Sequence, residues 1–434
     1  MTLALSVFVL TFIFVISEKV NRAVAAMLGG GLLVLGGVIS QEEAIAGIDF
    51  NTLGLLCGMM VIVAITRRSG IFQYLAVRAA KAVDARPWGI LVMLSLVTMV
   101  LSALLDNVTT VMLVTPVVLL ITQELEVPPY PFLFSQIMFA NIGGTATMIG
   151  DPPNILIGSV VESIGFNDFI LHLAPIVPLI GLATLLPIWL VWGRKMSATD
   201  EARNRILAFN EKEALRDRVV LKKSLGVIAL VLVGFAVGHP LGIPPATVAM
   251  FGAALLLFLD TLGKTPDKAS ALVHEAFGQV EWVTIFFFLG LFVVVTGVEH
   301  AGLLDIVADT IANFSDRAAP VAMLVMWMSA IISAVVDNIP FVATMIPVIE
   351  ELLPRLQEDV GSDASQAIWW SLALGACLGG NGSLIGASAN LIVAGYAERN
   401  GHPIRFIQFA LHAFPLMLMS VAIASVYVWL RYLT

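Results

Sequence analysis

Aspartate and asparagine stand next to each other twice inside the apolar part of this chain, as Asp106-Asn107 and Asp337-Asn338. A charged side chain at the middle of a membrane costs about 2.5–3.5 kcal/mol even on lenient insertion scales. The two pairs therefore indicate a site for protons, ions or a polar solute. If the turns that carry them reach the opposite membrane surface instead, the two aspartates are solvated helix caps.

Two glycine-rich motifs interrupt other apolar runs, GGTATMIGDPPN (143–154) and GGNGSLIGASAN (379–390). Glycine permits backbone conformations that other residues resist, and Pro152-Pro153 removes two amide donors in succession, so we expect a helix break at each motif. A broken helix in a membrane must face protein or a polar cavity, and its freed ends can hold an ion or a polar solute. With the turns, the motifs supply the candidate solute-binding residues Asn107, Thr109, Gly144, Thr145, Thr147, Asn154, Asn338, Gly380, Asn381, Ser383 and Asn390.

Asp151 distinguishes the first motif from the second, in which Ala387 takes the aligned position. Its carboxylate is either a proton-binding or cation-binding group, or the cap of the helix that follows. Together with Asp106 and Asp337 it makes three candidate proton-coupling residues. We expect no Lys or Arg within this core.

The composition is that of a polytopic membrane protein. Of 434 residues, 59% are hydrophobic and 12% are charged, whereas soluble domains have roughly 25% charged residues. The apolar runs suit the roughly 20-residue helix that crosses a bilayer. The two cysteines, Cys57 and Cys377, each lie in an apolar run, so we expect no disulfide and no metal site. We expect no cofactor and no nucleic-acid partner either.

The chain consists of two similar halves, residues 1–193 and 224–434, joined by a charged linker at 194–223. LLDNVTTVMLVTPV (104–117) matches VVDNIPFVATMIPV (335–348), and LLCGMMVIVAITRRSGIF (55–72) matches FFLGLFVVVTGVEHAGLL (287–304). Each half has a paired apolar run followed by an interrupted one. These runs are 88–124 and 131–160 in the first half, and 319–354 and 366–396 in the second.

The arrangement of the runs predicts that the halves are inverted. If each paired run is a re-entrant hairpin, each half crosses the membrane about five times, an odd number, which turns the second half over. We therefore predict an all-α polytopic membrane protein of two inverted-topology repeats, each with one re-entrant hairpin and one unwound helix. The positive-inside rule places the linker in the cytoplasm and both termini outside.

Through these residues the chain resembles the ion transporter superfamily, which includes ArsB-type arsenite efflux proteins, NhaD-type sodium/proton antiporters, the P protein of melanosomes and divalent anion/sodium symporters. The resemblance covers nearly the whole chain and rests on the DN-x₈-P hairpins and the two glycine-rich motifs. The symporter branch has Ser-Asn-Thr at the hairpin turns, so the Asp-Asn pairs are more similar to the arsenite and P-protein branch. The resemblance implies two hairpins and two unwound helices around one central site, a homodimer in many members, and elevator-like alternating access.

Among these members the chain is most similar to bacterial arsenite/antimonite efflux proteins. We therefore expect a secondary transporter, not an enzyme, which extrudes arsenite or antimonite across the inner (plasma) membrane in exchange for protons. Arsenite is largely a neutral hydroxide at neutral pH, which suits a site of hydroxyls, amides and backbone dipoles. Cys377 is a candidate thiol contact, although a lone buried cysteine is usually a packing residue. The sequence leaves open whether a soluble ATPase subunit takes part.

Three other functions would use some of the same residues. A sodium/proton antiporter would use the same acids as cation ligands and a sodium gradient. A dicarboxylate carrier is disfavoured by the acids at both hairpin turns, although helix dipoles alone can hold an anion. An intramembrane aspartyl protease is disfavoured because Asp151 follows Met-Ile-Gly, where that chemistry typically shows Gly-x-Gly before the aspartate.

Overall fold

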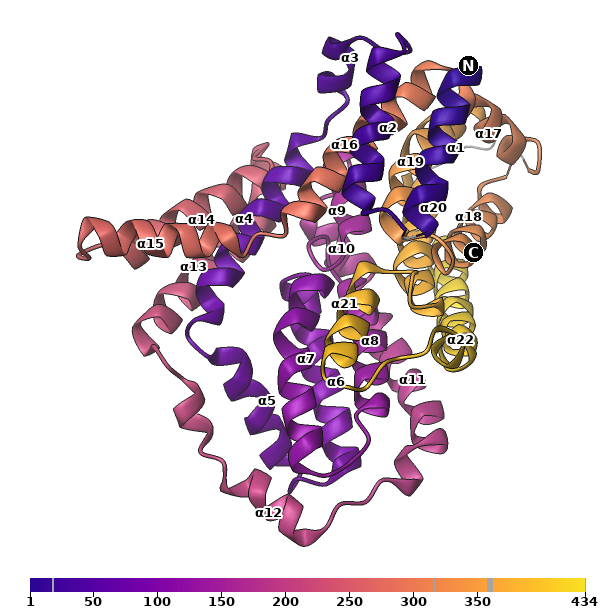
Figure 1. The fold of residues 1–434 in the computed structure, drawn as a ribbon. Helices are drawn as coiled ribbons and strands as arrows, with labels where there is room; N and C mark the ends of the chain where they lie inside the picture. Colours follow the sequence, from indigo (N-terminus) through magenta and orange to yellow (C-terminus); the bar gives the residue numbers. More distant parts are fainter. Residues whose placement is uncertain (18, 316, 357–361, 434) are drawn as a thin grey trace.

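A computed structural model describes residues 1–434 except 18, 316, 357–361 and 434, and the described chain is built of helices (Figure 1). The helices before the linker are α1 (Thr2–Ser17), α2 (Arg22–Leu35), α3 (Gln41–Ala46), α4 (Phe50–Arg67), α5 (Ile71–Ala82), α6 (Pro87–Leu104), α7 (Asn107–Glu124), α8 (Tyr130–Gly144), α9 (Pro152–Val160), α10 (Phe166–His172) and α11 (Val177–Val191). The linker contains the short 3₁₀ turns η1 (Gly193–Lys195) and η2 (Glu211–Ala214) around α12 (Asp200–Ala208).

The remaining helices follow in nearly the same order of lengths. They are α13 (Arg218–Gly238), η3 (His239–Leu241), α14 (Pro245–Thr261), α15 (Pro266–Gly278), α16 (Trp282–His300), α17 (Leu303–Ala312), α18 (Ala318–Ser333), α19 (Asn338–Leu352), η4 (Leu353–Arg355), α20 (Ser362–Gly379), η5 (Gly380–Gly382), α21 (Ser388–Arg399) and α22 (Phe406–Tyr432).

The length and hydropathy of the helices make this a multi-pass membrane protein. In the part of the chain that the structure describes, six helices are long and apolar enough to cross a bilayer, or seven if the bent pair α10 and α11 counts as one span. Four shorter apolar helices, α1, α2, α14 and α18, add to this apolar body. Of the helices broken at the glycine-rich motifs, α8, α9 and α21 are shorter than the roughly 17 residues that a span needs, whereas α20 has 18 residues.

The helices pack in two groups. In the group we call the scaffold, α2 lies against α16, α4 lies against α14, and α1 and α13 pack on α2 and α14. In the group we call the core helices, α6 packs on α8, α18 packs on α20, α7 lies against α21, and α19 lies against α9. Each of these contacts has a counterpart among the others in which the two halves exchange roles. The core helices contain both hairpin turns and both helix breaks.

Two glycines allow the scaffold helices to approach closely. A Cβ atom at Gly58 of α4 would lie 2.6 Å from the carbonyl carbon of Ala249 on α14, and one at Gly290 of α16 would lie 2.4 Å from that of Ala26 on α2. Small residues at such crossings let two backbones touch, which is a main source of helix attraction in lipid.

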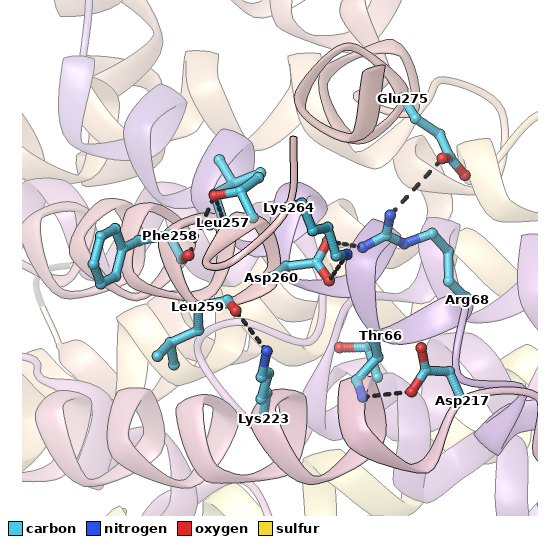
Figure 2. Close-up of polar contacts among 12 residues, drawn as sticks. Thr66, Arg68, Asp217, Lys223, Leu257, Phe258, Leu259, Asp260, Lys264 and Glu275 are labelled. Carbon is cyan, nitrogen blue, oxygen red and sulfur yellow. Dashed lines mark hydrogen bonds and ion pairs between the residues drawn. The ribbon is translucent and has the colours of Figure 1, made fainter. Parts of the chain in front are cut away.

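Ion pairs fasten the scaffold at one end (Figure 2). Asp260, near the end of α14, is 2% exposed and pairs with Arg68 at the end of α4 and, at 3.2 Å, with Lys264. Arg68 also lies 3.8 Å from Glu275 of α15. The Lys223 ammonium of α13 donates a hydrogen bond to the carbonyl of Leu259. Four scaffold helix ends are thereby held together.

The linker runs along the end of the molecule opposite to α3 (Figure 1). Lys81 of α5 donates to Glu211 of the linker at 2.7 Å, and the amide of Arg216 donates to the carbonyl of Ser69 at 3.0 Å. Arg205 of α12 reaches Glu126, just after α7. The linker therefore touches both α5 and the base of the first hairpin.

We predict that Gly290→Ala lowers the stability of the protein by about 2 kcal/mol, the usual cost of overpacking a tight contact, because the new Cβ meets the backbone of α2. Thermal unfolding in detergent measures the effect. Gly31→Ala on α2 is the matched control, since a Cβ there meets nothing within 4 Å. Equal melting temperatures for the two variants would contradict the close crossing.

Candidate functional site

The two Asp-Asn pairs lie at the turns of two helical hairpins. Asp106 follows α6, and its Oδ1 accepts a hydrogen bond from the amide of Thr109 at 2.7 Å. Asp337 follows α18, and its Oδ1 accepts one from the amide of Ile339 at 3.1 Å. Both aspartates are helix caps, but they are only 4% and 7% exposed. Both caps are therefore largely buried in the protein, and Asp337 lines a cavity of about 310 Å³ beside Arg22.

Each glycine-rich motif separates two short helices, and an asparagine closes each break. The amide group of Asn154 donates to the carbonyl of Thr147 at 2.9 Å, and that of Asn390 donates to the carbonyls of Gly380 and Ser383 at 2.8 Å each. Carbonyls freed by a helix break need such donors where no water is present. The two asparagines therefore make the breaks stable.

The hydroxyls of the motifs are also used within the breaks. Thr145 donates to the carbonyl of Asn141 at 2.8 Å, and Thr147 donates to the carbonyl of Ala103 at 2.6 Å. Ser383 accepts from the amide of Ile385 at 3.2 Å. These three candidate solute-binding side chains hold the loops in shape in this structure.

The motif glycines bring backbone segments together. A Cβ at Gly144 would lie 2.5 Å from the carbonyl oxygen of Gly150, and one at Gly380 would lie 3.0 Å from that of Gly386. Thr109, the remaining candidate, is 7% exposed and lines a cavity of about 240 Å³ between α4 and α7.

Asn141 of α8 joins the two halves, and we did not predict it. Its Oδ1 accepts from Asn107 at 3.1 Å, and its Nδ2 donates to Oδ1 of Asn381 at 3.0 Å and of Asn390 at 2.9 Å. It is completely buried. The signal in the sequence was an amide in the otherwise apolar end of α8, two residues before the glycine pair. Its aligned residue in the second half is Cys377.

Cys377 makes the corresponding contact from the second half. Its Sγ donates to Oδ1 of Asn154 at 3.4 Å, as Asn141 donates to Oδ1 of Asn390. The thiol is completely buried. Its place in the structure is thus that of a hydrogen-bonded partner of the opposite broken helix.

Asp151 lies between the two hairpin turns. Its Oδ1 accepts from Nδ2 of Asn338 at 3.3 Å, and the carbonyl of the preceding Gly150 accepts from the amide of Asn107 at 3.0 Å. Asp151 is completely buried and makes no side-chain capping bond to α9. It stands at the N-cap position of α9 without a capping hydrogen bond from its side chain, so its role as a proton-binding or cation-binding group stays a prediction.

Three buried oxygens around this point have no hydrogen-bond partner among the described residues. They are Oδ2 of Asp151, Oδ1 of Asn107 and Oγ1 of Thr110. Buried polar atoms are nearly always paired in folded proteins, and an unpaired one costs about 1–3 kcal/mol. Unpaired buried oxygens on Asp151, and on Asn107 and Thr110 in the first turn of α7, are positions where a solute or an ion can bind.

Arg22 corrects the expectation that no Lys or Arg lies in the core. Its guanidinium donates to Oδ2 of Asp337 at 3.0 Å, to Oγ of Ser388, and to Oγ1 of Thr284 at 3.1 Å. It also lies over the ring of Phe287, 5.2 Å from the centroid. Arg22 begins α2, so this ion pair connects the scaffold to the second hairpin.

The apolar helices, the buried hairpin turns and the broken helices that meet at Asp151 define a secondary transporter. Comparison with known proteins supports this class. The family model described as "Citrate transporter" (CitMHS) matches residues 12–375, and the chain belongs to this family.

Several relatives match nearly the whole of this chain, and the mycobacterial transporter among them is named only as uncharacterized. An uncharacterized transporter of Mycobacterium tuberculosis is 38% identical over 435 residues, which cover 99% of this chain and 98% of that protein. A 46 kDa membrane protein of Mycobacterium leprae is 38% identical over 439 residues, covering 99% of each. The human P protein is 32% identical over 512 residues, covering 98% of this chain and 59% of that longer protein.

The fold is similar to that of a solved transporter. The YdaH transporter of Alcanivorax borkumensis, described as having an unusual topology, aligns with a TM-score of 0.56 over 91% of this chain and 90% of that one. The sequence identity is 14%, so this likeness concerns the fold alone.

We predict that Asn141→Ala destabilises the protein by roughly 1–3 kcal/mol, because Oδ1 of Asn381 and of Asn390 lose their donor in a buried place. Thermal unfolding in detergent is the measurement. Ser420→Ala is the matched control, since Ser420 is also fully buried but donates only within its own helix. If both variants unfold at the same temperature, Asn141 does not join the halves.

Proposed function

We propose that the protein extrudes a small neutral hydroxylated solute, with arsenite and antimonite as the named candidates, in exchange for protons by elevator-like alternating access. The observation that carries this proposal is the pair of unpartnered acceptors, Oδ2 of Asp151 and Oδ1 of Asn107, between the two hairpin turns. Unpaired acceptors require a ligand that donates hydrogen bonds. Arsenite in its neutral form carries three hydroxyls and meets this requirement.

The same oxygens argue against a carboxylate at this point. A carboxylate ligand only accepts hydrogen bonds, and next to an ionised Asp151 it would add a like charge in a buried site. The guanidinium of Arg22, which reaches the second hairpin turn, is bound to Asp337. A neutral donor therefore fits the site better than an anion does.

Proton coupling is assigned to Asp151, Asp106 and Asp337. Asp151 is the group that touches both halves, through Asn338 and through the backbone beside Asn107. A proton on its carboxyl and a hydroxyl of the solute would compete for the same oxygen. Solute release on one side and proton uptake there are thereby linked, which is the requirement of an antiporter.

The membrane arrangement belongs to the same proposal. We infer two inverted repeats, residues 1–193 and 224–434, with the linker 194–223 in the cytoplasm and both termini outside, in the inner membrane. The scaffold would stay fixed while the core helices move. A homodimer and a soluble ATPase partner stay predictions of the family resemblance.

Two further candidates rest on particular observations. Converging acceptor oxygens also suit a sodium ion, which would make the protein a sodium/proton antiporter that uses the same carboxylates. Arg22 and Arg399 line a cavity of about 400 Å³ beside Tyr396 and Ser388, which would suit the carboxylates of a di- or tricarboxylate carrier. The family description names citrate, and this second cavity is where such an anion would bind.

We predict that purified protein in liposomes dissipates a pH gradient when arsenite or antimonite is supplied, and that Asp151→Asn reduces this flux to that of protein-free liposomes. A pH-sensitive dye inside the vesicles reports the flux. Asp200→Asn is the matched control, because its side chain is 90% exposed in the linker, and it should transport normally.

The same vesicles compare the candidates. A response to sodium alone supports the antiporter, and a response to citrate or succinate supports the anion carrier. Arsenite-driven flux that is equal in Asp151→Asn and the unmodified protein would contradict the proposed coupling.

A further inference from the structure

A cluster of three side chains closes the gap between the scaffold and the core helices in the first half. Oδ2 of Asp49 accepts hydrogen bonds from Oγ1 of Thr52 at 2.5 Å and from Oγ of Ser159. The two hydroxyls also lie 3.0 Å apart. Asp49 and Thr52 belong to the start of α4, whereas Ser159 belongs to the end of α9. The cluster therefore joins a scaffold helix to a broken core helix.

The sequence repeat gives this cluster a counterpart in the second half. Extending the alignment of α4 with α16 places Asp49 over Glu281 and Thr52 over Thr284, and the motif alignment places Ser159 over Gly395. In the structure these three residues do not close a gap. They line the cavity of about 400 Å³ instead.

The aligned helix ends of the two halves are thus arranged differently in this structure. The start of α4 touches the end of α9, but the start of α16 is separated from the end of α21 by that cavity. In a transporter built from an internal repeat, a helix pair in contact and its aligned pair held apart correspond to the closed and the open side of the transport path. One side of the path is closed in this structure and the other side is open.

Arg22 shows what must change for the open side to close. It lies in the wall of the cavity and links Thr284 to Asp337 and Ser388. Movement of α21 along α16 would carry Ser388 and Asp337 away from Arg22, so this ion pair breaks when the core helices move. Gly395 leaves room for that sliding, since a Cβ there meets only the end of the Arg399 side chain, at 3.6 Å.

We propose that Asp49, Thr52 and Ser159 form a gate on one side of the transport path, and that Glu281, Thr284 and Gly395 form its counterpart on the other side, so that one gate is closed when the other is open. This inference rests on the alternating access of the proposed function. With the linker in the cytoplasm, the Asp49 gate is the outer one and the Glu281 gate is the inner one.

Cysteine pairs test the gates without knowledge of the solute. Thr52→Cys/Ser159→Cys should form a disulfide readily on oxidation, because the hydroxyls that it replaces lie 3.0 Å apart. Thr284→Cys/Gly395→Cys should form one poorly in the resting protein. Free thiols are counted after denaturation by the gel shift of a polyethylene-glycol maleimide, above the two native cysteines. Ser95→Cys/Ser135→Cys, within the core helices at 2.6 Å, is the positive control for the oxidant.

The Asp49→Asn variant then tests whether one gate closes when the other opens. Asparagine keeps the capping bond to the amide of Asn51 but removes the charge that both hydroxyls share. We expect the cross-linking yield of the Thr52/Ser159 pair to fall and that of the Thr284/Gly395 pair to rise by about tenfold, as for two states that exchange population.

Three results would overturn the proposal. The first is a Thr52/Ser159 pair that stays reduced while the control pair oxidises. The second is an Asp49→Asn variant in which the Thr284/Gly395 yield does not rise. The third is a protein cross-linked at Thr52/Ser159 that still transports at the full rate. Failure to find any transported solute would count against the proposed function but would leave the cross-linking results interpretable.

Discussion

Backbone groups that are released inside a membrane must find partners within the protein, and this constraint determines the centre of the molecule. Two helices break at glycine-rich motifs, and their freed carbonyls are satisfied by the side-chain amides of Asn154 and Asn390. Each asparagine then has one acceptor oxygen left, which is bound by Cys377 or Asn141 from the opposite half. Stabilising each break therefore brings the two halves together, and the point where they meet is the candidate site.

The symmetry of this centre is incomplete, and the differences are where function can reside. Asp151 stands where the second half has Ala387, and Asn141 stands where it has Cys377. The first half thus contributes a carboxylate and an amide that are both completely buried. Away from this centre, the hydrogen-bonded cluster around Asp49 is closed, whereas the aligned residue Glu281 lines an open cavity. A sliding motion of the core helices along the scaffold would exchange the closed and the open arrangement between the two halves.

Much of this could be predicted from local sequence. The glycine pair and Pro152 place the break between α8 and α9, and the Asp-Asn pairs mark the hairpin turns, because each effect acts through the neighbouring backbone. Arg22 and the role of Asn141 could not be predicted, since their partners lie far away in the chain. Arg22 begins a scaffold helix near the membrane surface in the sequence pattern, and only tertiary packing brings it to Asp337. Which of the two aligned clusters is closed could likewise not be predicted, because Ser159 reaches Asp49 only through tertiary packing.

The proposed function requires that one solute binds between the hairpin turns and touches both halves. An experimental structure with antimonite bound tests it most directly, because antimony scatters strongly enough to be located. We predict antimony next to Oδ2 of Asp151 and Oδ1 of Asn107, with Asn338 nearby. Antimony found only in the cavity between Arg22 and Arg399, with Asp151 unchanged, would contradict the account.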